Sequence, residues 1–543
     1  METYKPKWPK TVMFWGAGAT AALGFKTTVQ IGNFFMELCK SCDKSSKNSI
    51  SGVFNKVTHD KAIDKSLENL FKFLDTSKDI NDIEAEIRQE FNGNGANRVK
   101  ELREYYDWNS LRKIMKVCPN YKVGRMKIQD LFNIIDMHIS EKEGFYVNDH
   151  GEEQFLPLQN IIKSRNTLVM MTTLIHSLNY HFNLLKNKNL LKPYYDFALC
   201  LGKLMQKDGI DAYNRGCKTD SREFYMYNYS IISLNWDPIL LWMIFNANRD
   251  LNNSSNVPYI GSPAVPIKLF NDMGNFMAVR KIDFEDQGIW YPFNETVAKR
   301  LNNPEHKTDR MVRIGKFYFP HGSSNWRECP NCGELFMYLG NEWDTHSKSL
   351  FPPQLIPKLS FHFKAKSKEE ENSVKNNQTD FIQCPFCGTM VSLINTPIVM
   401  QTNFKGNYPP SIENIQRDMR ISVENAEHIL LMGYSLPIDD TIYRSMFAAK
   451  VNRGGKHFCS VVVGNDKSFP DKWIYGHELE EYINNKSKDD SFKDAVQSAF
   501  DIFGKENVRG YGRGIPDVFL KNGSIDEARV KELINFPTSA PGV

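Results

Sequence analysis

Two short cysteine motifs constrain the fold of this chain more than any other feature. Cys329-Pro-Asn-Cys332-Gly and Cys384-Pro-Phe-Cys387-Gly share one pattern, and 51 residues lie between Cys332 and Cys384. Each motif offers two thiolates from one turn, and the glycine after it permits a left-handed backbone. Four thiolates leave no open coordination position, which suits a structural zinc ion; surface thiols or an iron–sulfur cluster are the alternatives. We therefore expect a zinc module at about residues 322–396.

Composition limits the class of protein. The chain has 543 residues, enough for two or three domains or for one domain with large insertions. Hydrophobic residues make up 41% and charged residues 24%, as in soluble globular proteins. There are only ten cysteines, which favours reduced thiols and a metal site over a disulfide framework. A net charge of +4 does not indicate nucleic acid as a partner.

The N-terminal apolar segment at residues 11–25 has two readings. Because lysines precede it, it resembles a short signal peptide. Gly16, Gly18 and Gly24 interrupt the run, however, and a phosphate-binding turn explains them better. No segment reaches the roughly 18 apolar residues that a membrane span needs. We expect a cytoplasmic protein without a membrane partner.

The same segment has the strand, glycine turn and helix order of a nucleotide-binding unit. The strand is Thr11–Trp15, and the turn reads Gly16-Ala17-Gly18-Ala-Thr20. Gly16 would allow the tight turn, Gly18 would let the backbone approach a pyrophosphate, and the helix start would offer N–H groups to phosphates. Ala21 replaces the third glycine of the usual fingerprint, and no clear acidic ribose ligand follows about 20 residues later. A glycine turn without a ligand is therefore the alternative.

Alternating apolar and amphipathic segments predict an α/β fold. Strands are expected at residues 229–234, 428–432 and 458–463, with helices at 411–426 and 439–450. Such alternation is typical of a Rossmann-like, doubly wound parallel sheet with helices on both faces. The remaining predictions follow by residue range: a first part of the core at 1–40, a mostly helical insertion at 41–165, the rest of the core at 166–520, a loop at 367–379 and a C-terminal tail at 521–543.

Polar residues follow the ends of several predicted strands. Taken singly, each has a structural reading, as a cap or as a hydrogen-bonded core residue. Ligands of open parallel sheets bind outside the carboxyl ends of the strands, so together these residues predict a binding site. They are Asn235 and Asp237, His321 after the apolar run Phe317–Pro320, Gly433 and Ser435, and Asn465.

In this order the motifs resemble those of the sirtuins. The variant forms of the glycine turn and of the Gly433 segment are most similar to divergent bacterial sirtuin-like proteins, several of which are NAD hydrolases of anti-phage defence. The resemblance covers about residues 11–25 and 229–466, and it leaves out the helical insertion and the tail. Its motifs are Gly16-Ala-Gly-Ala-Thr20, Leu234-Asn-Trp-Asp237, Pro320-His-Gly322, the two cysteine pairs, Gly433-Tyr-Ser-Leu-Pro437 and Gly464-Asn465.

The resemblance implies an NAD site and a role for each residue. Asn235 would contact the nicotinamide ribose and the attacking water, Asp237 would hold the carboxamide, and His321 would be a base near the ribose hydroxyls. Sirtuins bind NAD without the acidic ribose clamp of dehydrogenases, which fits its absence from the sequence. The other implied NAD ligands are Gly16, Ala17, Gly18 and Thr20 in the turn, and Gly433, Ser435 and Asn465 on the adenosine side.

Two departures from the deacylase pattern decide the predicted reaction. Phe25-Lys-Thr-Thr28 stands where deacylases carry Pro-Asp-Phe-Arg, and Val399-Met-Gln-Thr-Asn403 stands where they carry a Phe-Gly-Glu segment that pairs with the acyl-lysine peptide. We therefore predict hydrolysis of NAD to nicotinamide and ADP-ribose, with Asn235, Asp237 and His321 as catalytic residues. The alternatives are protein deacylation, ADP-ribosyl transfer, or an NAD sensor without turnover. The insertion would then contact a protein partner or a second copy of the chain.

Overall fold

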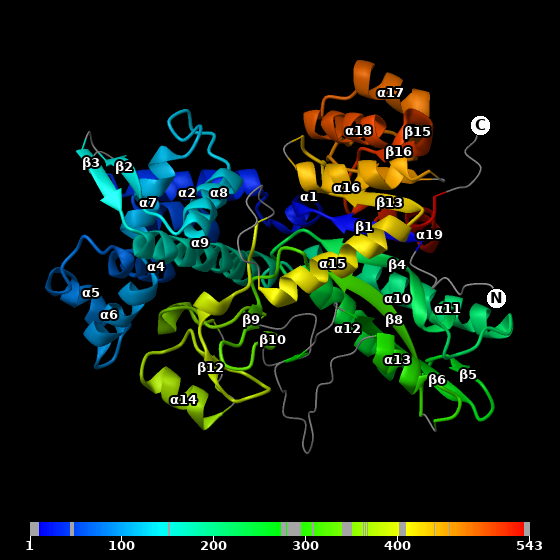
Figure 1. Cartoon of the computed structure of the whole chain (residues 1–543), viewed down its shortest axis with the longest axis horizontal. Helices are drawn as coiled ribbons and strands as arrows, with labels where there is room; N and C mark the ends of the chain where they lie inside the picture. The colour runs from blue at the N-terminus through cyan, green and yellow to red at the C-terminus, as the bar shows by residue number, and fades with distance from the viewer. Residues whose placement is uncertain are drawn as a thin grey trace.

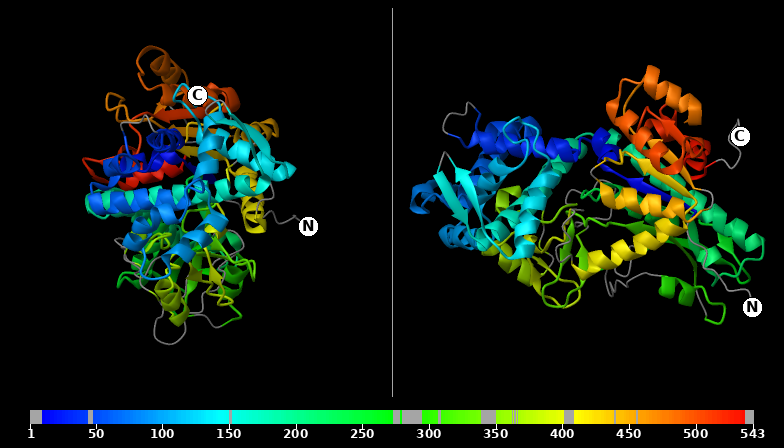
Figure 2. Two further views of the ribbon diagram at one scale, coloured as in Figure 1. Left: turned by 90° about the vertical axis from the view of Figure 1, so that its left-hand side faces the viewer. Right: turned by 45° about the horizontal axis from the view of Figure 1, so that its top comes forward.

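A computed structural model shows a sheet domain beside a helical module (Figure 1). In Figure 2 the two parts are seen from other sides, with the long helix α9 (Leu158–Asn179) running from the helical module toward the sheet. The structure describes residues 10–43, 48–149, 152–272, 278–279, 295–306, 309–338, 350–361, 363, 365, 367–400, 409–438, 440–454 and 457–536.

A nine-stranded, mostly parallel sheet forms the centre of the molecule, in the order β15-β16-β14-β13-β1-β4-β8-β6-β5. The strands from β16 to β6 are parallel, and only the short edge strands β15 and β5 are antiparallel. Among the parallel strands, β4, β6 and β8 lie on one side of β1, and β13, β14 and β16, which come later in the chain, lie on the other side. The strand order therefore reverses at β1. The bounds are β1 Thr11–Trp15, β4 Met226–Ser233, β5 Tyr259–Ile260, β6 Val265–Asp272, β8 Met311–Tyr318, β13 His428–Met432, β14 Phe458–Val462, β15 Ile474–Tyr475 and β16 Val508–Tyr511.

Helices cover both faces of this sheet, as the neighbours of β1 show. Phe14 packs edge-on against Phe447 of α16, with ring centroids 5.0 Å apart, whereas Trp15 stacks on Phe197 of α10 at 6.4 Å. Consecutive side chains of a strand point to opposite faces, so α10 and α16 lie on opposite sides. The predicted α/β class with a mostly parallel sheet is confirmed. The helices around the sheet are α10 Lys192–Asn214, α11 Arg222–Tyr225, α12 Ile239–Asn253, α13 Glu295–Leu301, α15 Pro410–Asn425, α16 Thr441–Asn452, α17 Gly476–Asn485 and α18 Asp490–Phe503.

The inserted segment folds into a mostly helical module with its own hydrophobic core. Most of that core lies between Ile31 of α2 and Phe182, after the end of α9, so the module extends beyond the predicted limits of 41 and 165. Trp236 and residues between Leu355 and Met400 complete the core from outside the module. A hairpin of β2 and β3 is its only sheet within the described range. The other elements are α2 Thr28–Ser41, α3 Ile50–Thr58, α4 Lys61–Leu74, α5 Glu84–Glu90, α6 Gly95–Tyr105, α7 Trp108–Val117, α8 Ile128–Glu141, β2 Phe145–Asp149 and β3 Glu152–Leu156.

Two predicted irregular segments are ordered instead. The segment predicted as a C-terminal tail at 521–543 contains α19 (Glu527–Ile534), which is capped by Asp526 and buries its apolar side in the main core. A small hairpin of β17 (Leu520–Lys521) and β18 (Ser524–Ile525) precedes it, and the end of the predicted tail, 537–543, lies outside the described residues. The predicted loop at 367–379 contains helix α14, Lys368–Lys375. No helix among the described residues is long and apolar enough to cross a membrane.

Candidate active site and metal centre

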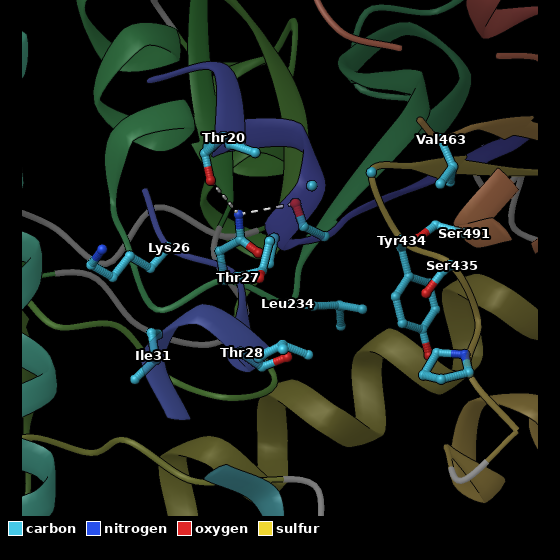
Figure 3. A pocket seen from close by; sticks show the side chains of 18 of the residues that line it. Thr20, Lys26, Thr27, Thr28, Ile31, Leu234, Tyr434, Ser435, Val463 and Ser491 are labelled. Carbon is cyan, nitrogen blue, oxygen red and sulfur yellow. Dashed lines mark hydrogen bonds between the residues drawn. The ribbon is translucent and has the colours of Figure 1, made fainter. Parts of the chain in front are cut away.

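A cavity of about 690 Å³ lies at the carboxyl ends of β1, β4, β13 and β14 (Figure 3). This volume is within the range of about 300–1,000 Å³ that is usual for ligand pockets. It opens where the strand order reverses, which is where open α/β sheets bind their ligands. The structure brings all the predicted non-cysteine site residues to its wall: Gly16, Ala17, Gly18, Thr20, Asn235, Asp237, His321, Gly433, Ser435 and Asn465.

The glycine turn packs tightly against the loop after β13. The Gly18 N–H donates to the Gly433 carbonyl at 2.9 Å, and a Cβ on Gly18 would lie 2.9 Å from the same oxygen. Gly433 has a φ of +62°, and a Cβ there would lie 2.0 Å from the Ala19 nitrogen. These glycines therefore let two strand-end loops touch, and Gly18 has this packing role in addition to any approach to a ligand. The helix predicted at this turn, α1 (Ala17–Thr20), is one turn long.

Asn235, Thr20 and Asp237 form one hydrogen-bond network in the wall. The Asn235 Nδ2 group donates to the Gly16 carbonyl and to the Thr20 hydroxyl, both at 3.1 Å. The Thr20 hydroxyl in turn donates to Asp237 Oδ2 at 3.1 Å, and the Ile239 N–H donates to Asp237 Oδ1 at 3.2 Å. Because a carbonyl only accepts, the contact to Gly16 fixes the orientation of the Asn235 amide. Its Oδ1 atom is buried and has no hydrogen-bond partner among the described residues.

Burial decides the protonation of Asp237. Asp237 is only 5% exposed, and this burial raises the pKa of its carboxyl group from 3.8 to about 6. The hydrogen bonds from Ile239 and Thr20 act in the opposite direction and lower the pKa. A buried carboxyl group near a cavity, with a pKa close to neutrality, is a feature of functional sites and also of structural networks. At pH 7 the group is ionised, so the folded state bears the free-energy cost of a buried negative charge.

His321 follows β8 and is held from both sides of its ring. Its Nδ1 atom lies 3.1 Å from the Leu234 carbonyl, which can only accept, so Nδ1 carries the proton. In the neutral ring Nε2 is then an acceptor, and the Tyr443 hydroxyl lies 3.3 Å from it. The Tyr443 ring packs edge-on against Phe14, with centroids 5.6 Å apart. This pairing fixes the tautomer that a general base at the cavity needs.

The end of the cavity opposite to Asn235 and His321 lies beyond β13 and β14. Ser435 and Asn465 line it, together with Val463 and Ser491, which Figure 3 shows across the cavity from Lys26. Asp489 also lines this end, and it comes from the N-cap of α18. Sequence reasoning missed this acidic residue, because it follows Asn465 by many positions and belongs to no recognised motif.

A second group of lining residues comes from the helical module and was also missed. Phe132 of α8 packs against Trp236, with ring centroids 5.6 Å apart, and so places α8 next to Asn235 and Asp237. The insertion therefore forms part of the candidate site. Its contributions to the cavity wall are Lys26, Thr27, Thr28, Val29 and Ile31 at the start of α2, Gln129, Asp130 and Asn133 on α8, and His176 on α9.

The four motif cysteines come together in a separate small module, as predicted. Their sulfur atoms all lie within 4.8 Å of one another, with Cys329 Sγ 3.5 Å from Cys387 Sγ and Cys332 Sγ 3.8 Å from Cys384 Sγ. No disulfide links them. A tetrahedral ion with sulfur bonds of about 2.3 Å has sulfur–sulfur edges of about 3.8 Å. The cluster could therefore hold a metal ion such as zinc.

Two antiparallel pairs of short strands build this cysteine module. The amides of Cys329 and Cys384 donate to the carbonyls of Glu334 at 2.9 Å and Thr389 at 2.8 Å, which closes each turn. Gly333 and Gly388 have φ values of +72° and +77°, the left-handed backbone predicted for them. The strands are β9 Trp326–Glu328 with β10 Leu335–Met337, which also pairs with β7 Ala278–Val279, and β11 Ile382–Gln383 with β12 Met390–Val391.

Neither the family models nor the curated proteins with which the sequence was compared give a match.

Proposed function

We propose that the chain binds NAD in a Rossmann-like, sirtuin-like core and hydrolyses it to nicotinamide and ADP-ribose. One observation carries the proposal. Asn235, Asp237 and His321 line the same cavity as the Gly16–Thr20 turn, Ser435 and Asn465. Groups suited to glycosidic cleavage and groups suited to a second nucleoside therefore share one cavity.

The length of the cavity supports a dinucleotide. Its lining runs from residues that follow β4 to residues that follow β14, and β13 and β1 lie between these strands. Neighbouring strands are about 4.8 Å apart, so the two ends are separated by about 14 Å. A mononucleotide would fill only part of that span. The apolar side chains at the β14 end, Val462, Val463 and Ile515, would pack against an adenine ring.

The chemistry of the reacting end fits cleavage of the bond between nicotinamide and ribose. Neutral nicotinamide departs, the ribose develops oxocarbenium character, and the oxygen of water bonds to the same carbon atom. The Asn235 oxygen, buried without a partner among the described residues, would accept a hydrogen bond from the ribose or the water once the amide shifts slightly toward the substrate. Asp237 would accept from the carboxamide. His321 Nε2 would take the proton released by water as the Tyr443 hydroxyl gives up its contact with that nitrogen.

The segment that docks an acyl-lysine peptide in deacylases is committed to other contacts here. The Val399 N–H donates to the His321 carbonyl at 3.0 Å, and the Val399 carbonyl accepts from Trp236 Nε1 at 3.3 Å. Both backbone groups of Val399 therefore have partners within the chain, and its N–H group is not available to pair with an extended peptide. Residues 401–403 of this segment lie outside the described residues. The use of the Val399 backbone within the chain favours water over an acyl-lysine as the acceptor.

Zinc is the metal we propose for the cysteine cluster. Four thiolate ligands with no open position suit a structural zinc ion, and the sulfur–sulfur distances fit its tetrahedron. The ion would hold together the two strand pairs of the module. It lies in a module separate from the cavity, so no step of the proposed reaction depends on it.

The test is incubation of the full chain with NAD, with and without an acetylated peptide, followed by product analysis. We expect nicotinamide and ADP-ribose without peptide. Asn235→Ala should lose turnover by about 100-fold or more while keeping much of its NAD affinity, because Asn235 faces the reacting ribose. Asn425→Ala is the control, because this exposed residue does not line the cavity and donates to the Ile421 carbonyl of its own helix at 2.7 Å; turnover should be unchanged. Acetylated ADP-ribose formed only with peptide would make the protein a deacylase, and NAD binding without any product would make it a sensor.

A further inference from the structure

The acidic residue at the far end of the cavity carries a further inference, which rests on the proposed function. We propose that Asp489 binds a hydroxyl of the adenosine ribose and thereby selects NAD against NADP. The sequence offers no acidic ribose ligand within the glycine-turn unit, and the sirtuin resemblance requires none. The fold supplies one from a distant segment, the N-cap of α18.

The carboxylate of Asp489 is fixed by contacts from two separate segments. Its Oδ2 atom accepts from the Asn465 N–H at 3.3 Å, and its Oδ1 atom accepts from the Phe492 N–H at 3.1 Å. A Cβ on Gly464 would lie 2.6 Å from Oδ2, so the carboxylate sits directly over the backbone at the end of β14. Each oxygen of a carboxylate accepts about two hydrogen bonds. Asp489 is therefore held in place and still has capacity to accept from a ligand.

The position of Asp489 assigns it to the adenosine half of the ligand. Under the proposed function, Asn235, Asp237 and His321 take the nicotinamide ribose at the β4 and β8 end. Asp489 lines the cavity with Asn465 at the β14 end, about 14 Å away by strand spacing. At that distance in NAD, beyond the pyrophosphate, lies the second ribose. Its 2′- and 3′-hydroxyl groups are donors, and a carboxylate is an acceptor.

The charges around the cavity argue against a phosphate at this ribose. Among the described residues that line the cavity, Lys26 is the only lysine or arginine, and Figure 3 shows Lys26 on the side opposite to Ser491 and Val463. Arg513, next to the lining residue Gly514, forms an ion pair with Asp517 at 3.4 Å. A 2′-phosphate, with a charge of about −1.5 to −2, would therefore meet Asp489 without a lining cation to neutralise it.

Steady-state kinetics with NAD and with NADP tests the inference. We expect the wild-type protein to prefer NAD in kcat/KM by at least about 100-fold, since juxtaposed like charges cost several kcal/mol. Asp489→Asn removes the charge but keeps a good N-cap residue for α18, so the fold should be retained. This variant should lose at least about tenfold of the preference. Asp490→Asn is the matched control, because Asp490 is the exposed next residue of the same helix start and does not line the cavity.

Calorimetric titration with NAD and NADP separates this inference from the proposed reaction. A wild-type chain that binds NAD more tightly than NADP without hydrolysing it would overturn the hydrolase proposal. The same result would support the role of Asp489 if Asp489→Asn reduces the ratio between the two dissociation constants. Wild-type protein that accepts NADP as readily as NAD would refute the inference, as would an Asp489→Asn variant with an unchanged ratio. A chain that binds neither dinucleotide would refute both proposals.

Discussion

Replacing Asp237 with asparagine should make the protein more stable and less active. The raised pKa of Asp237 means that the folded state holds its proton more tightly than the unfolded state does, because burial penalises the charge. As the pH rises from 3.8 to about 6, Asp237 ionises in the unfolded chain before it ionises in the folded protein. The contribution of Asp237 to the free energy of unfolding is thus fully present below about pH 4 and is lost as the pH rises to about 6.

The size of the effect follows from the two pKa values. A difference of about two pH units corresponds to about 3 kcal/mol of unfolding free energy at pH 7. Asparagine carries no charge and avoids this loss. Its single oxygen can replace the Asp237 Oδ1 atom that accepts from Ile239, but the Nδ2 group in the place of Oδ2 cannot accept from the Thr20 hydroxyl. One neutral hydrogen bond is worth about 1 kcal/mol. We expect Asp237→Asn to be about 2 kcal/mol more stable than wild type at pH 7, with no advantage at pH 4.

Urea denaturation of both proteins at pH 4, 5, 6 and 7 measures this difference. The exposed-site variant Asp490→Asn should show a difference from wild type that hardly changes with pH, and so controls for the loss of one negative charge. NAD turnover by Asp237→Asn should fall in the same samples, because the carboxylate at the reacting end is gone. If Asp237→Asn is no more stable than wild type at pH 7, or its advantage does not grow between pH 4 and pH 6, the reasoning from burial is refuted.

Two further variants test the metal centre and the candidate base. Cys329→Ser should lose the metal ion and have a lower Tm, because metal binding contributes to the folding free energy of such modules; elemental analysis and calorimetry check this, and a stable variant with one zinc ion per chain would contradict it. Tyr443→Phe keeps the ring contact with Phe14 but removes the hydroxyl from His321 Nε2. Turnover should fall by about three- to tenfold with KM for NAD unchanged and the pH profile displaced, and a wild-type profile would show that Tyr443 does not position His321.

The sequence predicted the parts of the site that follow directly from a buried strand. β1 and β13 match their predicted ranges, and β14 differs by one residue, because short apolar runs bounded by polar and glycine residues can be buried on both faces only in a central sheet. Asn235, His321 and Asn465 come together because parallel strands end at one edge of a sheet. No knowledge of long-range packing was needed for that step.

Residues supplied by packing between distant segments could not be predicted in this way. Asn133 and Lys26 reach the cavity because the helical module docks on the sheet domain, and Phe132 against Trp236 is the contact that sets this docking next to the site. Asp489 depends on where α18 begins relative to the end of β14. None of these relations leaves a local pattern in the sequence.

Two missed helices are different, since local signals for both were present. In α19 the apolar residues Val530, Leu533 and Ile534 have helical spacing, and Asp526 is a capping residue before them. In α14 the N-cap Ser367 accepts from Glu370 N–H at 3.1 Å, and acidic residues fill the first turn. The polarity of α14 masks these end signals, because a short helix with few apolar residues has the composition of a loop.

The helical module is joined to the candidate site at both of its ends. The chain enters the module at Thr28 and leaves it through α9, and both Thr28 and His176 of α9 line the cavity. His176 is kept neutral by burial, which lowers its pKa to about 4, and its Nδ1 atom bonds to the Ser324 hydroxyl at 2.8 Å. Ser324 follows His321 by three residues and its N–H donates to the Trp236 carbonyl at 2.8 Å. The module is thus tied to the segments that carry the candidate base and its neighbours. Its helices therefore form part of the cavity wall beside Asn235, Asp237 and His321, and a substitution in the module can alter the candidate site without changing any of these three residues.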